Sequence, residues 1–328
     1  GVISNMEERK SLVGRFGETL QGILDQRGRI FKDAGEEVTG VGFQSLREYN
    51  RARATPQGAH LPPLPYLFIF VDEFGPAHLP PGGGMDVRPH PHINLATVTW
   101  LFEGAIDHRD SIGTFSTIRP GTVNLMTAGS GIVHSERSPE SERKGGPRMF
   151  GMQTWLALPD GREEIDPAFE AIDDLPVVED GGARAIVIMG DLWGERAATT
   201  TYADTIYAEI VLAPGGQLPI DSPADERALM VVDGEATLDG MDLPLYTLVV
   251  IKPGDCPALR SEKGARLMLL GGESFKTERH VFWNFVSSDR ERINQAKKDW
   301  KAGNFPKVPG DEEEWIPLPE KPKTVTYP

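Results

Sequence analysis

Short hydrophobic segments follow one another along the chain from Gly40 onward, and glycine, proline and aspartate separate them. The clearest segments are residues 67–71, 95–102, 117–118, 123–125 and 153–158. Some alternate between apolar and polar positions and others are apolar throughout, as expected of strands with one or both faces buried. With 36 glycines and 27 prolines to supply turns, the pattern predicts an all-β fold of sandwich or barrel type.

Apolar residues at helical spacing are found near both ends of the chain. The first 35 residues carry such a pattern, weakened by interspersed glycines, at Leu12, Phe16, Leu20, Ile23 and Leu24. A stronger helix is predicted near the C-terminus from an N-cap at Ser288, a capping-box Glu291, an apolar stripe of Ile293, Ala296 and Trp300, and a stop at Gly303. Six prolines in residues 305–328 predict an extended strap, packed by Trp315 and Ile316 or partly disordered.

The second half of the β region repeats the first. Residues 118–121 (Ile-Arg-Pro-Gly) match residues 251–254 (Ile-Lys-Pro-Gly), and residues 101–104 match residues 231–234. Two β-barrel domains are therefore predicted. The expected boundaries are an N-terminal extension at 1–38, a first barrel at 39–160, a linker at 161–180, a second barrel at 181–278, and a C-terminal helix and tail at 279–328.

Composition and charge exclude several classes of binding partner and of structure. The formal net charge of −15 and the absence of any basic block exclude direct binding to nucleic acid, which requires Lys and Arg to neutralise phosphate. The one cysteine, Cys256, excludes an intramolecular disulfide framework, and we expect it to be an ordinary buried side chain. No apolar run reaches the roughly 20 residues of a membrane helix and no signal peptide opens the chain, so we expect a cytoplasmic protein. We also expect a monomer, since two barrels of one chain can satisfy each other.

Two pairs of residues with strand spacing suggest a metal site. His90 and His92 are two residues apart, as are His134 and Glu136. Alternate residues of a strand point to the same face, so two such strands side by side would direct three imidazoles and one carboxylate at one point. That donor set suits a divalent transition metal such as Fe(II), Cu, Ni, Zn or Mn. In the alternative, Glu136 hydrogen-bonds to a ligating imidazole instead of binding the ion.

The other histidines have simpler interpretations. His108 lies in a charged segment and is expected to be a solvated loop residue, while His60 and His78 lie among prolines without partners. His280 begins the tail and is expected to pack or to hydrogen-bond. His90 and His92 lie 14 and 12 residues before Gly104, and the same distances before Gly234 in the second barrel fall on Ile220 and Ser222. One metal ion is therefore expected, in the first barrel.

These motifs resemble those of the pirin family, whose members have two cupin domains. The matching segments are residues 72–76, 89–92, 97–104, 108–111, 126–129 and 131–136, with further similarity at 283–288 and 305–310. The resemblance implies two cupin barrels with one metal, usually iron, in the first. It also implies His90, His92, His134 and Glu136 as ligands. Many relatives carry a glutamate where this chain has Ala96, which leaves Glu136 as the one carboxylate ligand.

The resemblance leaves two functions open. Some bacterial pirins are quercetin 2,3-dioxygenases, which implies a metal-dependent oxygenase that acts on a small phenolic, flavonol-like substrate with dioxygen. Glu136 would then be both a ligand and the catalytic base for the substrate hydroxyl. Animal pirin is an iron-dependent transcriptional cofactor, which implies a redox-sensing protein that binds a protein partner and consumes no substrate. A barrel that holds adventitious zinc or nickel without activity is a third reading.

Overall fold

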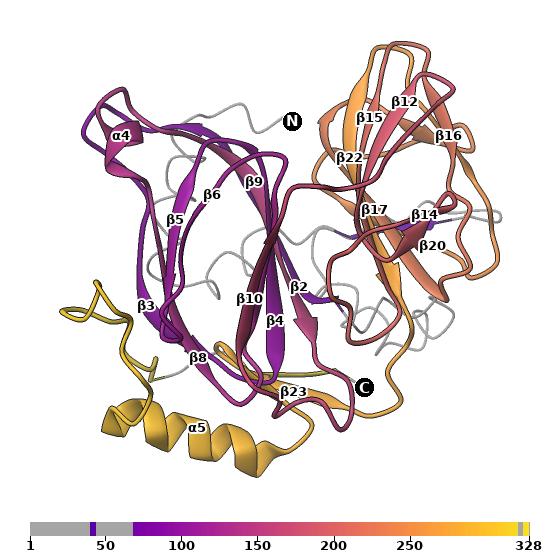
Figure 1. The fold of residues 1–328 in the computed structure, drawn as a ribbon. Coiled ribbons are helices and arrows are strands. Elements are labelled where there is room, and N and C mark those ends of the chain that lie inside the picture. Colours follow the sequence, from indigo (N-terminus) through magenta and orange to yellow (C-terminus); the bar gives the residue numbers. More distant parts are fainter. Residues whose placement is uncertain (1–39, 44–67, 321–323, 328) are drawn as a thin grey trace. The chain divides into compact units, whose positions relative to one another are not determined.

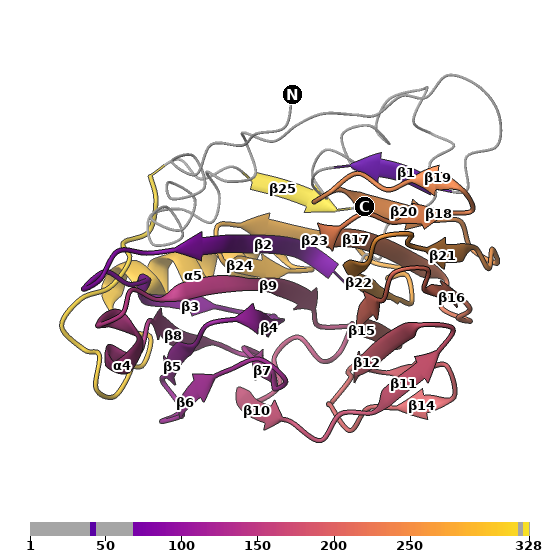
Figure 2. The same ribbon diagram turned by 90° about the horizontal axis from the view of Figure 1, so that it is seen from above.

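A computed structural model describes residues 40–43, 68–320 and 324–327. The helical pattern predicted in the first 35 residues and His60 lie outside these residues. The described part consists mainly of antiparallel strands with two helices, which confirms the predicted all-β fold (Figures 1 and 2). Among the described residues, no helix is both long and apolar enough to span a membrane.

The chain divides into two compact units. Of the described residues, the first unit contains 71–173 and 277–327, and the second contains 40–43, 68–70 and 174–276. Within the expected linker, residues 168–172 pair with a strand of the first unit and residues 177–180 with a strand of the second. Residues 40–43, expected in the first barrel, pair with a strand of the second unit.

The first unit is built from two sheets. The five-stranded sheet has the order β10 (Ala168–Ile172), β7 (Val123–Thr127), β4 (Leu95–Glu103), β9 (Arg148–Ala157) and β2 (Phe68–His78). The four-stranded sheet has the order β3 (Asp86–His92), β8 (Ile132–Arg137), β5 (Ile106–Asp110) and β6 (Phe115–Ile118), and α4 (Glu140–Arg143) follows β8. Both faces of β4 and β7 are buried along most of their length, which explains why these strands contain no charged residue except Glu103 at the end of β4.

The second unit repeats this arrangement. Its larger sheet has the order β1 (Gly40–Phe43), β20 (Leu248–Ile251), β17 (Glu226–Gly234), β22 (Ala265–Gly272), β15 (Thr205–Leu212), β12 (Ala183–Met189) and β11 (Val177–Asp180). Its smaller sheet has the order β16 (Gln217–Pro219), β21 (Ala258–Arg260), β18 (Thr237–Leu238) and β19 (Met241–Asp242). The hairpin of β13 (Asp191–Leu192) and β14 (Glu195–Arg196) completes the unit.

Strand order and register show which of the two sequence matches between the barrels joins structurally equivalent residues. A β-bulge interrupts the β4–β9 pairing between Leu101 and Glu103, and another interrupts β17–β22 between Val231 and Asp233. The match between residues 101–104 and 231–234 is therefore confirmed. The Pro-Gly match is wrong by one strand, because residues 118–121 precede β7 whereas residues 251–254 follow its counterpart β20. Pro-Gly turns recur wherever strands are connected, so they are weak markers of register.

The C-terminal segment packs onto the first unit (Figure 1). β23 (Arg279–Phe282), β24 (Phe285–Ser287) and β25 (Thr324–Tyr327) form a small sheet, and α5 (Arg290–Ala302) follows β24. The N-cap of α5 is Asp289 rather than the predicted Ser288, since the Asp289 side chain accepts a hydrogen bond from the Glu291 amide. Gly303 ends the helix in the left-handed conformation, as predicted.

The strap after α5 is fastened to the strands of the candidate site. Arg137 on β8 donates to both carboxylate oxygens of Asp311, at 2.8 and 2.9 Å. The Ile316 amide donates to the carbonyl of Pro89 on β3 at 2.9 Å. Ile316 packs against the α5 cluster, whereas Trp315, predicted to pack, is 55% exposed. The strap therefore braces both strands that carry the candidate ligands.

Candidate metal centre

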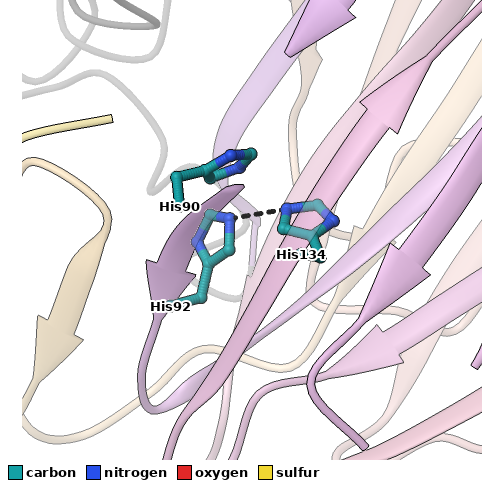
Figure 3. A group of neighbouring side chains, drawn as sticks. All are labelled: His90, His92 and His134. Carbon is teal, nitrogen blue, oxygen red and sulfur yellow. Dashed lines mark hydrogen bonds between the residues drawn. The ribbon is translucent and has the colours of Figure 1, made fainter. Parts of the chain in front are cut away.

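Three histidines meet inside the first unit (Figure 3). β3 and β8 pair in antiparallel register with His90 opposite His134, and His92 follows two residues later on the same face. One ring nitrogen from each of the three residues lies within 4.8 Å of the other two. The Nε2 atoms of His92 and His134 are 3.1 Å apart. Strand spacing alone predicted this convergence, and the structure brings the three rings together.

The local sequence of β3 explains how these rings are presented. Prolines at 89 and 91 cannot donate to a β-ladder, and β3 lies at the edge of its sheet, where proline is tolerated. The pairing with β8 shifts by a bulge between Val87 and His90, which redirects the strand at the first histidine. The Nδ1 atom of His90 lies 2.9 Å from the Arg88 carbonyl and donates to it, so Nε2 keeps its lone pair.

Burial keeps the three imidazoles neutral. It lowers the pKa of His90 from 6.5 to about 4, with an opposing contribution from the backbone hydrogen bond to Arg88. Burial, together with the neighbouring imidazoles, also lowers the pKa values of His92 and His134 well below their usual range. The neutral imidazole is the form that binds a metal ion.

The acid sensitivity of the metal-free protein follows from these shifts. Between pH 6.5 and about 4 the unfolded chain binds a proton at His90 that the folded chain does not, so the fold loses stability as the pH falls. The His90 shift alone corresponds to about 3 kcal/mol. Glu136 acts in the opposite direction, because burial raises its pKa from 4.5 to about 7, but one carboxyl group opposes three imidazoles.

We therefore expect the urea midpoint of the metal-free protein to fall steeply between pH 6.5 and pH 4.5. The variant His90→Asn lacks one of the three titrating rings and should show a shallower fall. A wild-type midpoint that stays level or rises over this interval would contradict the assignment of three neutral buried rings.

The separation of the His92 and His134 rings fits a transition-metal ion. Two imidazole nitrogens bound to one ion at about 2.1 Å lie about 3.0 Å apart at right angles and about 3.4 Å apart in a tetrahedron. The observed separation of 3.1 Å between His92 Nε2 and His134 Nε2 falls between these values. Three imidazole nitrogen donors also match the chemistry of Fe, Ni, Cu or Zn.

Glu136 lies two residues beyond His134 on β8 and is 2% exposed. Its Oε1 atom accepts a hydrogen bond of 2.8 Å from Gln153 on β9. The carboxylate does not belong to the group of atoms that lie within 4.8 Å of one another, which the three imidazoles form by themselves. Its role as a ligand stays a prediction, and Gln153 is a contact that the sequence did not reveal.

His108 is the clearest correction to the sequence predictions. It is buried on β5, opposite Glu136 in register, and is not a solvated loop residue. Its Nε2 atom donates to Asp110 at 2.9 Å, and its ring stacks on Phe169 and lies 5.4 Å from the His134 ring. The signal was present in the sequence: Ile106, His108 and Asp110 alternate in the same way as His90 and His92.

The remaining predictions have simple outcomes. His78 is exposed, and His280 is buried on β23, where it pairs with β24 and β25. Cys256 was expected to be buried, but it is exposed because it lies in the turn between β20 and β21 rather than in a strand.

The second barrel lacks the donor set. Its β16–β21 pairing reproduces the β3–β8 pairing, with Leu218 opposite Leu259 where Val87 lies opposite Glu136. The positions corresponding to His90, His92, His134 and Glu136 are Ile220, Ser222, Pro257 and Leu259. The corresponding end of the barrel is instead occupied by Arg227, which donates to the carbonyls of Ile220, Lys252 and Asp255. Among the described residues, the three-histidine group is found only in the first unit.

Comparison with known proteins agrees with this architecture. The family profile described as Pirin matches residues 48–156, and that of the Pirin C-terminal cupin domain matches residues 207–306. A pirin-like protein of Caulobacter vibrioides is 44% identical over 282 residues, which cover 84% of this chain and 96% of that protein. A crystal structure of quercetin 2,3-dioxygenase from Acinetobacter baumannii is 30% identical, with a TM-score of 0.75 over 91% of this chain and 97% of that chain. The chain belongs to the pirin family and combines an N-terminal pirin domain with a C-terminal cupin domain.

Proposed function

We propose that this protein is a metal-dependent dioxygenase that acts on a small phenolic, flavonol-like substrate. The observation that carries the proposal is the convergence of three buried, neutral imidazoles, with a buried carboxylate two residues beyond His134 on β8. The likeness to the quercetin 2,3-dioxygenase of Acinetobacter baumannii, at 30% identity over almost the full length, supports the substrate class. Fe(II) is the proposed ion, since a set of three nitrogens and one oxygen lies between the soft and hard extremes of metal preference.

Each residue has a role in this proposal. His90, His92 and His134 hold the ion, and Glu136 completes the set as its carboxylate ligand. The bound ion would supply Lewis acidity toward the phenolic hydroxyl and a redox centre for dioxygen. Glu136 would accept the hydroxyl proton at its carboxylate, as a general base positioned beside the phenolic oxygen. Burial of the four side chains excludes water from the reacting groups.

The experiment is turnover by the reconstituted protein. Metal-free protein is loaded separately with Fe(II), Mn(II), Ni(II), Cu(II) or Zn(II) and mixed with quercetin, while flavonol absorbance and dissolved dioxygen are followed together. We expect loss of quercetin and dioxygen in about equal amounts, and no loss under nitrogen. The variant Glu136→Gln should lower kcat by about 100-fold or more, the usual contribution of a positioned base. Protein that holds its ion yet consumes neither quercetin nor dioxygen would overturn the oxygenase proposal and leave the metal site intact.

A further inference from the structure

A buried polar network continues from Glu136 to the five-stranded sheet. The side-chain amide of Gln153 on β9 donates to Glu136 Oε1 at 2.8 Å and to Thr99 Oγ1 on β4 at 3.2 Å. All three residues are at most 4% exposed. Thr99 and Gln153 are register partners across β4 and β9. The network therefore joins the carboxylate on the four-stranded sheet to two strands of the other sheet.

The second barrel provides an internal comparison for this network. Its β17–β22 pairing has Leu229 opposite Leu269, two residues before the same bulge that follows Thr99 and Gln153 in the first barrel. The position of Glu136 corresponds to Leu259. Leu229, Leu259 and Leu269 belong to one apolar core cluster. Leucine therefore occupies all three corresponding positions in the second barrel, so the fold itself does not require the polar trio of Thr99, Gln153 and Glu136.

We infer that Gln153, supported by Thr99, is a positioning residue that holds the Glu136 carboxylate toward the three imidazoles. A glutamate side chain has three rotatable bonds, and fixing Oε1 on the amide restricts the plane of the carboxylate. Oε2 is then the oxygen available to the ion or to a substrate hydroxyl. Contacts of this kind orient the groups that bind a metal, and their removal commonly weakens binding by about 10- to 100-fold. The inference rests on the proposed function, because it assigns Glu136 to the metal centre.

The test uses Co(II), whose visible absorption reports its coordination geometry, as the probe ion. The variant Gln153→Met keeps the length of the side chain and removes both hydrogen bonds. We expect its dissociation constant for Co(II), measured against a chelator, to rise about 10- to 100-fold, with a changed visible spectrum. Thr99→Val retains the Gln153–Glu136 bond and should change both readouts in the same direction but less. In quercetin turnover, Gln153→Met should lower kcat while KM stays within about twofold.

Thr154→Val is the matched control. Thr154 is the next residue of β9, is 0% exposed and faces the opposite side of the sheet. Its hydroxyl has no hydrogen-bond partner among the described residues, so valine should leave Co(II) affinity and spectrum unchanged. A Gln153→Met protein with the wild-type spectrum and affinity would overturn the inference, even if it were less stable. Failure of the wild-type protein to bind Co(II) would instead remove the proposed metal centre itself, so the two failures are distinguishable.

Discussion

Replacement of His134 with alanine is expected to reduce the metal content from about one ion per chain to less than about a tenth, after dialysis against a weak chelator. His134 is the proposed ligand from β8, and it faces both histidines of β3: its ring centroid is 4.3 Å from that of His90 and 5.0 Å from that of His92. Without it, the two remaining imidazoles come from one strand and cannot enclose the ion. Elemental analysis of protein purified without an affinity tag measures the content directly.

Loss of the ion should also lower the free energy of unfolding of the His134→Ala protein. An ion present at about 1000 times its dissociation constant adds about 4 kcal/mol to the free energy of unfolding, and His134→Ala should lose that increment. His78→Ala is the control, because His78 is exposed and lies outside the cluster. Retention of a full complement of metal by His134→Ala would show that the ion binds elsewhere.

The candidate ligands could be predicted from the sequence because the side-chain period of a strand is two. His90 with His92, and His134 with Glu136, needed only neighbouring strands to converge. Their register could not be read from the sequence. It depends on the bulge between Val87 and His90, and a shift of one residue would have turned one pair to the other face of the sheet.

His108 shows where sequence patterns mislead. It is flanked by Asp107 and Arg109, so the segment looks like a charged turn. The structure turns those neighbours to the outer face of β5 and His108 to the inside, where Asp110 and Phe169 hold it. Gln153 was missed for a different reason: its contacts come from β4 and β8, far away in the sequence, and a single glutamine within an apolar strand gives no local signal.

The two barrels share features of the backbone but not the side chains of the candidate metal site. The second barrel lacks the donors yet has the same strand order and bulge, since these depend on backbone pairing rather than on any one side chain. At the end of the second barrel, three backbone carbonyls from two loops require hydrogen-bond donors. Arg227, 0% exposed, supplies them from β17 with bonds of 2.8 Å to Ile220 and 3.1 Å to Lys252 and a further bond to Asp255.

Replacement of Arg227 with methionine is therefore expected to cost about 3 kcal/mol of stability. Methionine is similar in length but donates no hydrogen bond, so three carbonyls lose a charged donor at once. Removal of one partner from such bonds costs roughly 1–3 kcal/mol for each group left buried and unsatisfied. Water reaching the loop of residues 252–255 would recover part of this loss. Urea unfolding should show a lower midpoint for the second unit, while the metal content, which the proposal assigns to the first unit, stays at the wild-type value.

Arg196→Met provides the matched control within the same unit. Arg196 pairs with Asp191 on the surface, and its side chain is 67% exposed, so the loss of that pair should change stability by less than about 0.5 kcal/mol. If Arg227→Met were as stable as this control, water alone would satisfy the three carbonyls. The guanidinium would then be incidental to the second barrel. A large loss confined to Arg227→Met would instead show that, where the first barrel is proposed to bind a metal ion, the second is closed by a cation of its own chain.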